Sequence, residues 1–309
     1  MDKGCKGETE GQRIQVPTNP LRGYCADPDL KMVDGRWYMY CTQDGLPGWS
    51  STVMSVYEST DLCTWQEHRI LDLHDVPWWE GRQGAWAPCM METANGLFVL
   101  YFVADGQIGL ATSPTPIGPF TPAATPLIRA DAYDCQTIDP SIFVDEDGTT
   151  YLLWGNGRVY MAALSDDGTA IVDATLKTWV PDNFREAITI SRHGGRYYAS
   201  WSENDTRDPE YRVRYAVSDS LDGPWGQPQV LVEKDEGKGI LGTGHHCILQ
   251  VPGTDQWIIA YHRFAMDGHG DGCHREIVCA PLAFDDEGGM KRIHPQVGSY
   301  WCPAPSTQL

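Results

Sequence analysis

The chain has 309 residues, of which 41% are apolar and 21% are charged, a composition typical of a globular protein rather than a disordered one. Its 42 acidic and 23 basic residues give a formal net charge of −19. Such a charge repels phosphate backbones and anionic lipid headgroups, so neither nucleic acid nor a membrane is expected as a partner. No apolar stretch approaches the length of a membrane span.

The N-terminal segment, residues 1–18, is predicted to be an extension ahead of the folded domain. The first twenty residues contain no apolar run like that of a secretory leader, so a cytoplasmic location is expected, or a secreted one if a leader has been trimmed away. The ten cysteines stand at scattered spacings without a Cys-x-x-Cys pair, which gives no indication of a zinc site or a redox motif. Reduced thiols are the expectation for a chain that is not secreted.

A turn followed by a strand recurs five times along the chain. The units are VDGRWYMYCT (33–42), ANGLFVLYFV (94–103), EDGTTYLLWG (146–155), HGGRYYASWS (193–202) and GTDQWIIAYH (253–262). Each begins with a Gly or Asp turn and continues with aromatic and β-branched residues, which is typical of a hairpin that enters a buried strand. Successive units begin between 47 and 61 residues apart. This is the spacing of the blades in a propeller.

The neighbouring segments complete each repeat. A short apolar segment precedes each unit and another strand follows it, so each repeat holds at least three strands, with room for a fourth. No amphipathic helical stretch competes with this pattern, and 32 Gly and 21 Pro punctuate the chain. A β-helix has shorter coils, and a sandwich has no reason to repeat five times. We therefore predict an all-β protein in which residues 1–309 form a single five-bladed β-propeller.

The residues just ahead of each first strand are the candidate site residues. Aligning the five units places ADP (26–28), WAP (86–88), IDP (138–140), REA (185–187) and GHH (244–246) at the same position. The first strand of each blade lines the central axis of a propeller, so three carboxylates, a Trp and a His are expected to converge at one end of it.

Each of these residues also has a purely structural interpretation. Asp-Pro pairs such as those at Asp27 and Asp139 are common turn starters. Glu186 could form a surface ion pair with Arg185, and His245 could be a core histidine. Structural repeats favour like residues at like positions, however, so this set of unlike residues favours a functional site.

Seven segments stand in a specific order and spacing along the chain: NPLRGYCADPDL (19–30), WAPCMM (86–91), IGLATSPTPIGPF (108–120), TIDPSIFVDEDG (137–148), FREAITISRHGGRYYASWS (184–202), GTGHHCI (242–248) and WIIAYHR (257–263). Through these segments the chain resembles glycoside hydrolase family 43 over nearly its whole length. This resemblance implies that Asp27 is the general base and Glu186 the general acid, and that Asp139 orients the acid and raises its pKa. An inverting glycosidase needs such an ionised and protonated pair. A negative charge beside Glu186 would keep the proton on it near neutral pH.

The same resemblance implies further binding residues. Trp86 and Arg275 are expected to bind the sugar, together with Trp79 and His246, although Trp86 could equally be a core aromatic and Arg275 half of a surface ion pair. His245 is expected beside a calcium or sodium ion in the central channel. Calcium prefers oxygen ligands, so waters or carbonyls would have to complete its shell. No organic cofactor is expected.

The family acts on plant polysaccharides that contain arabinose and xylose. Loops around the active face should set the specificity: the segment that contains Trp79, and residues 203–211 and 266–273. Large loops tend to close a pocket, so we expect an inverting, exo-acting α-L-arabinofuranosidase or β-D-xylosidase that acts on hemicellulose or pectin oligosaccharides. The alternatives are an endo-1,5-α-L-arabinanase, a retaining invertase-like propeller hydrolase, whose Asn-Asp-Pro-Asn-Gly motif ADPDL does not match, and a non-catalytic glycan-binding propeller.

Overall fold

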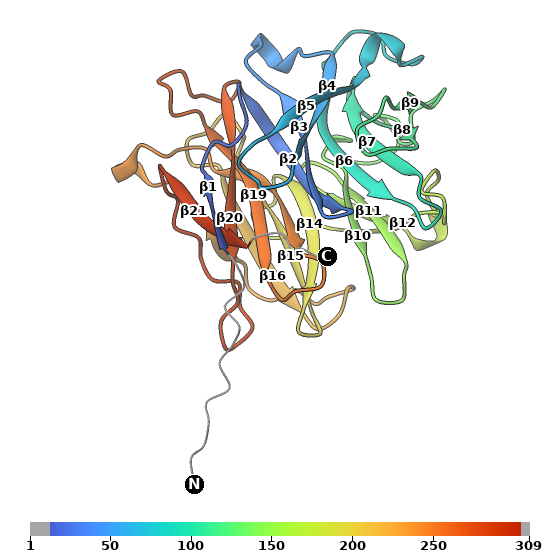
Figure 1. The fold of residues 1–309 in the computed structure, drawn as a ribbon. Coiled ribbons are helices and arrows are strands. Elements are labelled where there is room, and N and C mark those ends of the chain that lie inside the picture. The colour runs from blue at the N-terminus through green and yellow to red at the C-terminus, as the bar shows by residue number, and fades with distance from the viewer. Residues whose placement is uncertain (1–12, 304–309) are drawn as a thin grey trace.

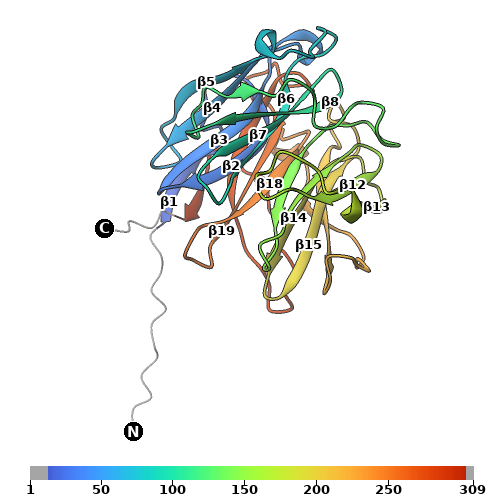
Figure 2. The ribbon, with the colours of Figure 1, turned by 90° about the vertical axis from the view of Figure 1, so that its right-hand side faces the viewer.

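Each of the five predicted turn-plus-strand units forms the first hairpin of its own antiparallel β-sheet. The computed structural model describes residues 13–303, in which the sheets follow one another around a central axis (Figures 1 and 2). Segments 1–12 and 304–309, and with them most of the extension predicted over 1–18, lie outside the described residues. Within residues 13–303 no helix is long and apolar enough to cross a membrane.

Four sheets have four strands and the fifth has three. The first two blades are β2 (Cys25–Val33), β3 (Arg36–Gln43), β4 (Val53–Ser59) and β5 (Gln66–Asp72), then β6 (Trp86–Glu92), β7 (Phe98–Ala104), β8 (Gln107–Ser113) and β9 (Thr121–Pro122). The third and fourth are β10 (Ser141–Val144), β11 (Thr150–Trp154), β12 (Val159–Ala163) and β13 (Lys177–Trp179), then β14 (Glu186–His193), β15 (Arg196–Glu203), β16 (Arg212–Ser218) and β17 (Gln229–Val232). The fifth is β18 (Gly244–Gln250), β19 (Trp257–Phe264) and β20 (Arg275–Leu282). Short 3₁₀ turns cover Pro47–Trp49, Leu73–Asp75, Asp173–Thr175 and Glu236–Lys238.

The first strands of the blades form a closed ring. β2 contacts β6, β6 contacts β10, β10 contacts β14, β14 contacts β18, and β18 returns to β2. Side chains of neighbouring blades form the hydrophobic clusters between the sheets, so a middle strand such as β7 is buried along its whole length. This explains why the second strands have continuous apolar sequences instead of alternating ones. The prediction of a five-bladed all-β propeller is confirmed.

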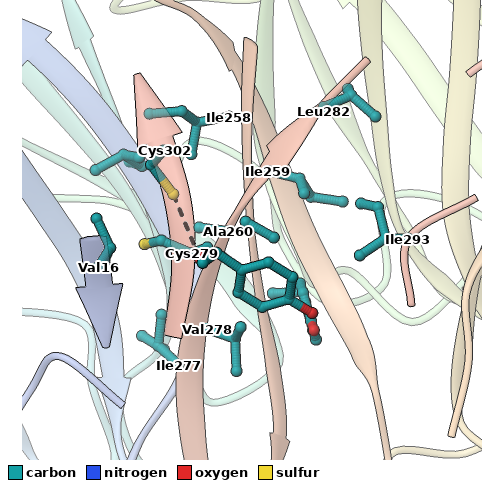
Figure 3. Packing of buried hydrophobic residues seen from close by; sticks show 14 of the residues in the cluster. Val16, Ile258, Ile259, Ala260, Ile277, Val278, Cys279, Leu282, Ile293 and Cys302 are labelled. Carbon is teal, nitrogen blue, oxygen red and sulfur yellow. Dashed lines mark hydrogen bonds between the residues drawn. The ribbon is translucent and has the colours of Figure 1, made fainter. Parts of the chain in front are cut away.

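The two ends of the described chain meet beside the fifth blade. β1 (Arg13–Pro17) pairs antiparallel with β21 (Ser299–Pro303), and both contact β20 (Figure 1). Val16 from β1 and Cys302 from β21 are fully buried in the same cluster as Cys279 from β20, whose carbonyl oxygen lies 3.8 Å from the Cys302 thiol (Figure 3). The N-terminal and C-terminal strands therefore cover the three-stranded sheet together. All nine cysteines in the described part of the chain are free thiols.

Candidate active site

A residue with positive φ marks the start of the first strand in every blade. These residues, none of them glycine, are Asp27, Ala87, Asp139, Ala187 and His245, with φ between 40° and 58°. In blades one, two, four and five the register between the first two strands shifts at this residue, as at a β-bulge. Non-glycine residues seldom adopt this conformation, and functional sites are where such residues gather.

The positions of the bulges show that the alignment of the five repeats was wrong by one residue at Glu186. Glu186 pairs with Ser202 just ahead of the bulge, as Trp86 pairs with Val103 in blade two. The residue of blade four that matches Asp27 is therefore Ala187, and Glu186 was wrongly placed level with Asp27. The bulge is shared by blades one, two, four and five, but the short motif REA does not show which of its residues occupies the bulge position. Glu186 and Trp86 thus share one position of the repeat, directly before the bulge.

A small cavity of about 150 Å³ lies where these strand starts converge. It brings together Asp27, Asp139 and Glu186, the three predicted catalytic carboxylates, and also the predicted residues Trp86, His245 and Arg275. Its remaining walls are Trp49, Gln136, Ile138, Asn156, Arg185, Asp205, Thr206 and Arg207. The predicted convergence of side chains from all five blades at one end of the axis is therefore present.

Asp27 is a buried carboxylate held by a guanidinium, an imidazole and a hydroxyl group. Its Oδ1 lies 3.0 Å from Arg275 Nη1 and 3.2 Å from His245 Nδ1, and its Oδ2 accepts a hydrogen bond of 2.6 Å from the Thr42 hydroxyl. Burial by itself would raise the pKa of Asp27, but the Arg275 charge, with His245 and His262, lowers that pKa well below its usual range. Asp27 is therefore ionised at neutral pH, as a general base must be.

Arg275 is an internal residue and not part of a surface ion pair. It is 3% exposed, and its guanidinium binds Asp44 through Nε and Nη2 at 2.6 and 2.9 Å while Nη1 reaches Asp27. The bidentate pair with Asp44 fixes the plane of the guanidinium, so its third nitrogen points at the carboxylate of Asp27.

Glu186, in the wall of the same cavity, accepts two hydrogen bonds. Asn156 Nδ2 donates to Oε2 at 2.6 Å and the Tyr211 phenol donates to Oε1 at 2.8 Å. Burial raises the pKa of Glu186 to about 7, against the lowering effects of the Tyr211 hydrogen bond and the Arg185 charge, and Asp27 and Asp205 add to the increase. A carboxyl group with this pKa can hold a proton near neutral pH and give it up, as a general acid must.

Asp139 and Glu186 each disfavour ionisation of the other. Burial and the charges of Glu186 and Asp27 raise the pKa of Asp139 well above its usual range, against a hydrogen bond from the Ala187 backbone. Its Oδ2 is buried and has no hydrogen-bond partner among the described residues. This differs from the expectation of a permanently charged Asp139 beside the acid. The two carboxyl groups titrate as a pair that keeps at least one proton to near neutral pH.

His245 stands between two of the carboxylates, with Nδ1 at 3.2 Å from Asp27 Oδ1 and 3.8 Å from Asp139 Oδ2. Burial lowers the pKa of His245, so the ring is neutral. Among residues 13–303, no group of three or more His, Cys, Asp or Glu side chains is arranged to hold a metal ion. Calcium needs six to eight oxygen ligands. The side chains around His245 do not supply such a shell, and no catalytic step is assigned to an ion.

Two tryptophans form one wall of the cavity. The indole of Trp86 donates to the Trp49 carbonyl at 2.7 Å, and the two rings meet edge to face with 6.1 Å between centroids. Trp49 in turn donates to the carbonyl of Gly272 at 2.7 Å, which ties the loop after β3 to the loop before β20. Flat rings held at a fixed angle suit the apolar face of a sugar.

The structure does not bring the other two predicted binding residues to this cavity. Trp79 packs against the core between blades one and two, with its indole donating to the carbonyl of Gln83. His246 lines a second cavity farther along the axis, where its Nε2 lies 2.7 Å from the Ser200 hydroxyl. His245, Asp27 and Asp139 line both cavities, whereas His246, which follows the bulge, lines only the second.

Several wall residues were not identified from the sequence as single positions. Asp205, Thr206 and Arg207 lie in the 203–211 segment that was predicted to form the active face, and Arg207 binds Asp205 through two nitrogens at 2.6 and 2.7 Å. Trp49 lies in a Gly- and Pro-rich loop, and Asn156 is the second residue after the end of β11. An aromatic residue in such a loop is only a weak indication of a binding site, and an Asn after a strand gives no indication of one.

Comparison with known proteins identifies the family. The family model for glycosyl hydrolases family 43 matches residues 17–290. A β-D-galactofuranosidase of Aspergillus niger is 29% identical over 88% of this chain and 83% of its own, and a xylosidase/arabinosidase of Bacteroides ovatus is 26% identical over 87% and 95%. The crystal structure of a family-43 enzyme of Xanthomonas citri complexed with xylose superposes with a TM-score of 0.74 at 25% identity, over 96% of each chain.

These similarities agree with the site geometry. One carboxylate, Asp27, is held ionised, while Asp139 and Glu186 keep a proton between them, which is the division of roles that hydrolysis of a glycosidic bond requires. The family model spans most of the chain, and the predicted resemblance is confirmed. The chain belongs to family 43 of the glycosyl hydrolases, which are inverting O-glycoside hydrolases.

Proposed function

We propose that this glycosidase is exo-acting and releases single terminal pentoses, α-L-arabinofuranose or β-D-xylose, from hemicellulose or pectin oligosaccharides. The observation that carries the proposal is the small cavity in which an ionised Asp27 faces the proton-holding pair of Asp139 and Glu186. A cavity of about 150 Å³ suits one sugar ring better than a segment of polysaccharide.

In the reaction, Asp27 acts as the general base and Glu186 as the general acid. Asp27 takes a proton from the attacking water, and Glu186 gives its proton to the oxygen of the leaving group. Asp139 orients Glu186 and shares its proton, because each of the two carboxyl groups disfavours ionisation of the other. Arg275 keeps Asp27 ionised, and Trp86 with Trp49 flanks the sugar ring.

The walls support exo action. Trp49, Trp86 and the ion-paired Asp205 and Arg207 surround the cavity from different blades and loops, and such walls favour the end of a chain over its middle. The names of the two relatives support the release of a single terminal sugar, since they refer to galactofuranosides, xylosides and arabinosides.

The test is to assay aryl α-L-arabinofuranoside, β-D-xyloside and β-D-galactofuranoside with the wild type, Asp27→Ala and Glu186→Ala. We expect Asp27→Ala to be inactive on all three. Glu186→Ala should keep relatively more activity on aryl groups that leave easily, because these need little protonation; general acid catalysis is usually worth roughly 10²- to 10⁴-fold.

Other outcomes would favour other functions. Full activity in both variants would refute the assignment of base and acid. Internal cleavage of debranched arabinan, without release of monosaccharide, would indicate an endo-arabinanase. Proton NMR of the first product gives the anomer, and retention of configuration would contradict inversion.

A further inference from the structure

The last residue of each repeat unit lies opposite the bulge of its own blade and beside the bulge of the next. These residues are Thr42, Val103, Gly155, Ser202 and His262. In three places the side chain accepts the backbone N–H of the next bulge residue. The N–H of Ala87 donates to Thr42 Oγ1 at 2.8 Å, that of His245 to Ser202 Oγ at 2.9 Å, and that of Asp27 to His262 Nδ1 at 3.3 Å. Blades one, two and five are thus each hydrogen-bonded to the preceding blade at the cavity.

Blades two and three lack such a side chain, because their residues at this position are Val103 and Gly155. The Ala187 N–H, the bulge N–H that would face Gly155, acts on the Asp139 carboxyl and lowers its pKa. Buried backbone donors are almost always paired. The N–H groups of Ala87, His245 and Asp27 therefore share one kind of partner, a side chain of the preceding blade, and among these partners is a hydroxyl that touches a catalytic carboxylate.

Thr42 is the hydroxyl that touches one. It is 1% exposed, accepts the N–H of Ala87 and lies 2.6 Å from Oδ2 of Asp27. A hydroxyl has a single proton to donate, and an ionised Asp27 can only accept. With the Ala87 N–H occupying one lone pair of the oxygen, the hydroxyl proton is directed at Asp27. A bond from a donor to a carboxylate is among the stronger hydrogen bonds in proteins.

We propose that Thr42 is a positioning residue for the general base: its hydroxyl, oriented by the Ala87 amide of the next blade, holds the Asp27 carboxylate in its reactive orientation and ionised form. This inference rests on the proposed role of Asp27. It differs from the role of Arg275, because Arg275 binds Oδ1 whereas Thr42 binds Oδ2, so the two fix the plane of the carboxylate together.

The experiment compares Thr42→Val and Thr42→Ser with the wild type in kcat/KM against pH on an aryl pentoside. Valine keeps the shape of Thr and occurs naturally at the same position of blade two, as Val103, so the ring accommodates it. The variant removes a hydrogen bond to ionised Asp27, which raises the pKa of that carboxyl. We expect the low-pH limb of the profile to move to higher pH and the plateau of kcat/KM to fall roughly 10- to 100-fold. Thr42→Ser should restore both.

Ser141→Ala is the matched control. The Ser141 hydroxyl also bonds the next blade, donating to the Ile188 carbonyl, but it contacts no carboxylate of the cavity. Its profile should keep the wild-type shape. A wild-type profile for Thr42→Val, or a Thr42→Ser variant as impaired as Thr42→Val, would overturn the proposal. If Thr42→Val fails to fold, Thr42→Ala also removes the hydroxyl, and the same change in the pH profile of kcat/KM is expected for it. An active Asp27→Ala would instead refute the role of Asp27 itself.

Discussion

At the scale of single residues, the proton affinity of Glu186 depends on one buried phenol. Tyr211 is fully buried, donates to Glu186 Oε1 at 2.8 Å, and stacks on His262 with 5.5 Å between ring centroids. The donated hydrogen bond stabilises the ionised form of Glu186 and so lowers its pKa. The pKa of about 7 is therefore a balance between burial, which raises it, and Tyr211, which lowers it.

Tyr211→Phe should shift this balance. Without the phenol the pKa of Glu186 rises above about 7, and since the acid must be protonated to act, the high-pH decline of kcat/KM should move to higher pH. At its optimum the variant should lose no more than about tenfold in kcat/KM, the usual worth of one such hydrogen bond. The measurement is a pH profile on a substrate with a poor leaving group.

Tyr198→Phe serves as the control for this prediction. Tyr198 is also a buried tyrosine of blade four, but its phenol donates to the carbonyl of Gly288, away from the cavity. Its pH profile should match the wild type. A high-pH limb of Tyr211→Phe that moved to lower pH would show that the phenol acts on Glu186 in another way.

At the scale of elements, the strands were predictable and the bulges were not. Both faces of a blade are covered by neighbours, so second strands such as FVLYFVA of β7 are apolar throughout and easily recognised beside their Gly turns. Asp27 and Asp139 could be located because Asp-Pro recurs at similar distances from those turns. Glu186 was found but placed one residue out of register, because only the pairing of the strands shows which residue of REA occupies the bulge position.

The strand that covers the fifth blade carries an element-scale prediction. Val16 of β1 is fully buried against β20 and β21, while Gln15 on the other face of the same strand is exposed. Burying an unpaired charge costs several kcal/mol. Val16→Asp should therefore lower Tm by about 10 °C or more, measured by calorimetry.

Gln15→Asp introduces the same charge one residue away and gives the matched control. It removes only a surface hydrogen bond to Ser299, so its Tm should stay within about 2 °C of the wild type. Equal losses in the two variants would mean that charge near the chain ends, and not burial of β1, sets the stability of this region.

At the scale of the whole molecule, the site is assembled from parts that are far apart in sequence. Asp27 and Arg275 stand at opposite ends of the chain, yet their side chains lie 3.0 Å apart because the fifth blade closes the ring against the first. Repeat spacing predicts this convergence for strand starts. Repeat spacing does not predict which loop residues line the cavity, so Trp49 and Asn156 were missed. For the same reason Trp79 was placed in the site, although it packs against the core between blades one and two.

The net charge of −19 gives the molecule a field that acts on charged substrates. The cations at the cavity mouth do little to offset it, since Arg185 and Arg207 both pair with Asp205, at 2.9 Å for Arg185 and 2.6 Å for Arg207. We therefore expect a xylo-oligosaccharide that carries a glucuronic acid to be processed more slowly at low salt than a neutral one of equal length.

Raising the ionic strength tests this expectation. The screening length falls from about 30 Å at 0.01 M to about 3 Å at 1 M, which removes repulsion from charges beyond the cavity wall. Over this range kcat/KM on the acidic oligosaccharide should rise severalfold, while kcat/KM on the neutral one, which has no charge to repel, should stay nearly constant. If salt instead slowed the acidic substrate, the local attraction of Arg185 and Arg207 would exceed the field of the whole molecule, and the acidic substituent would have to bind beside Asp205.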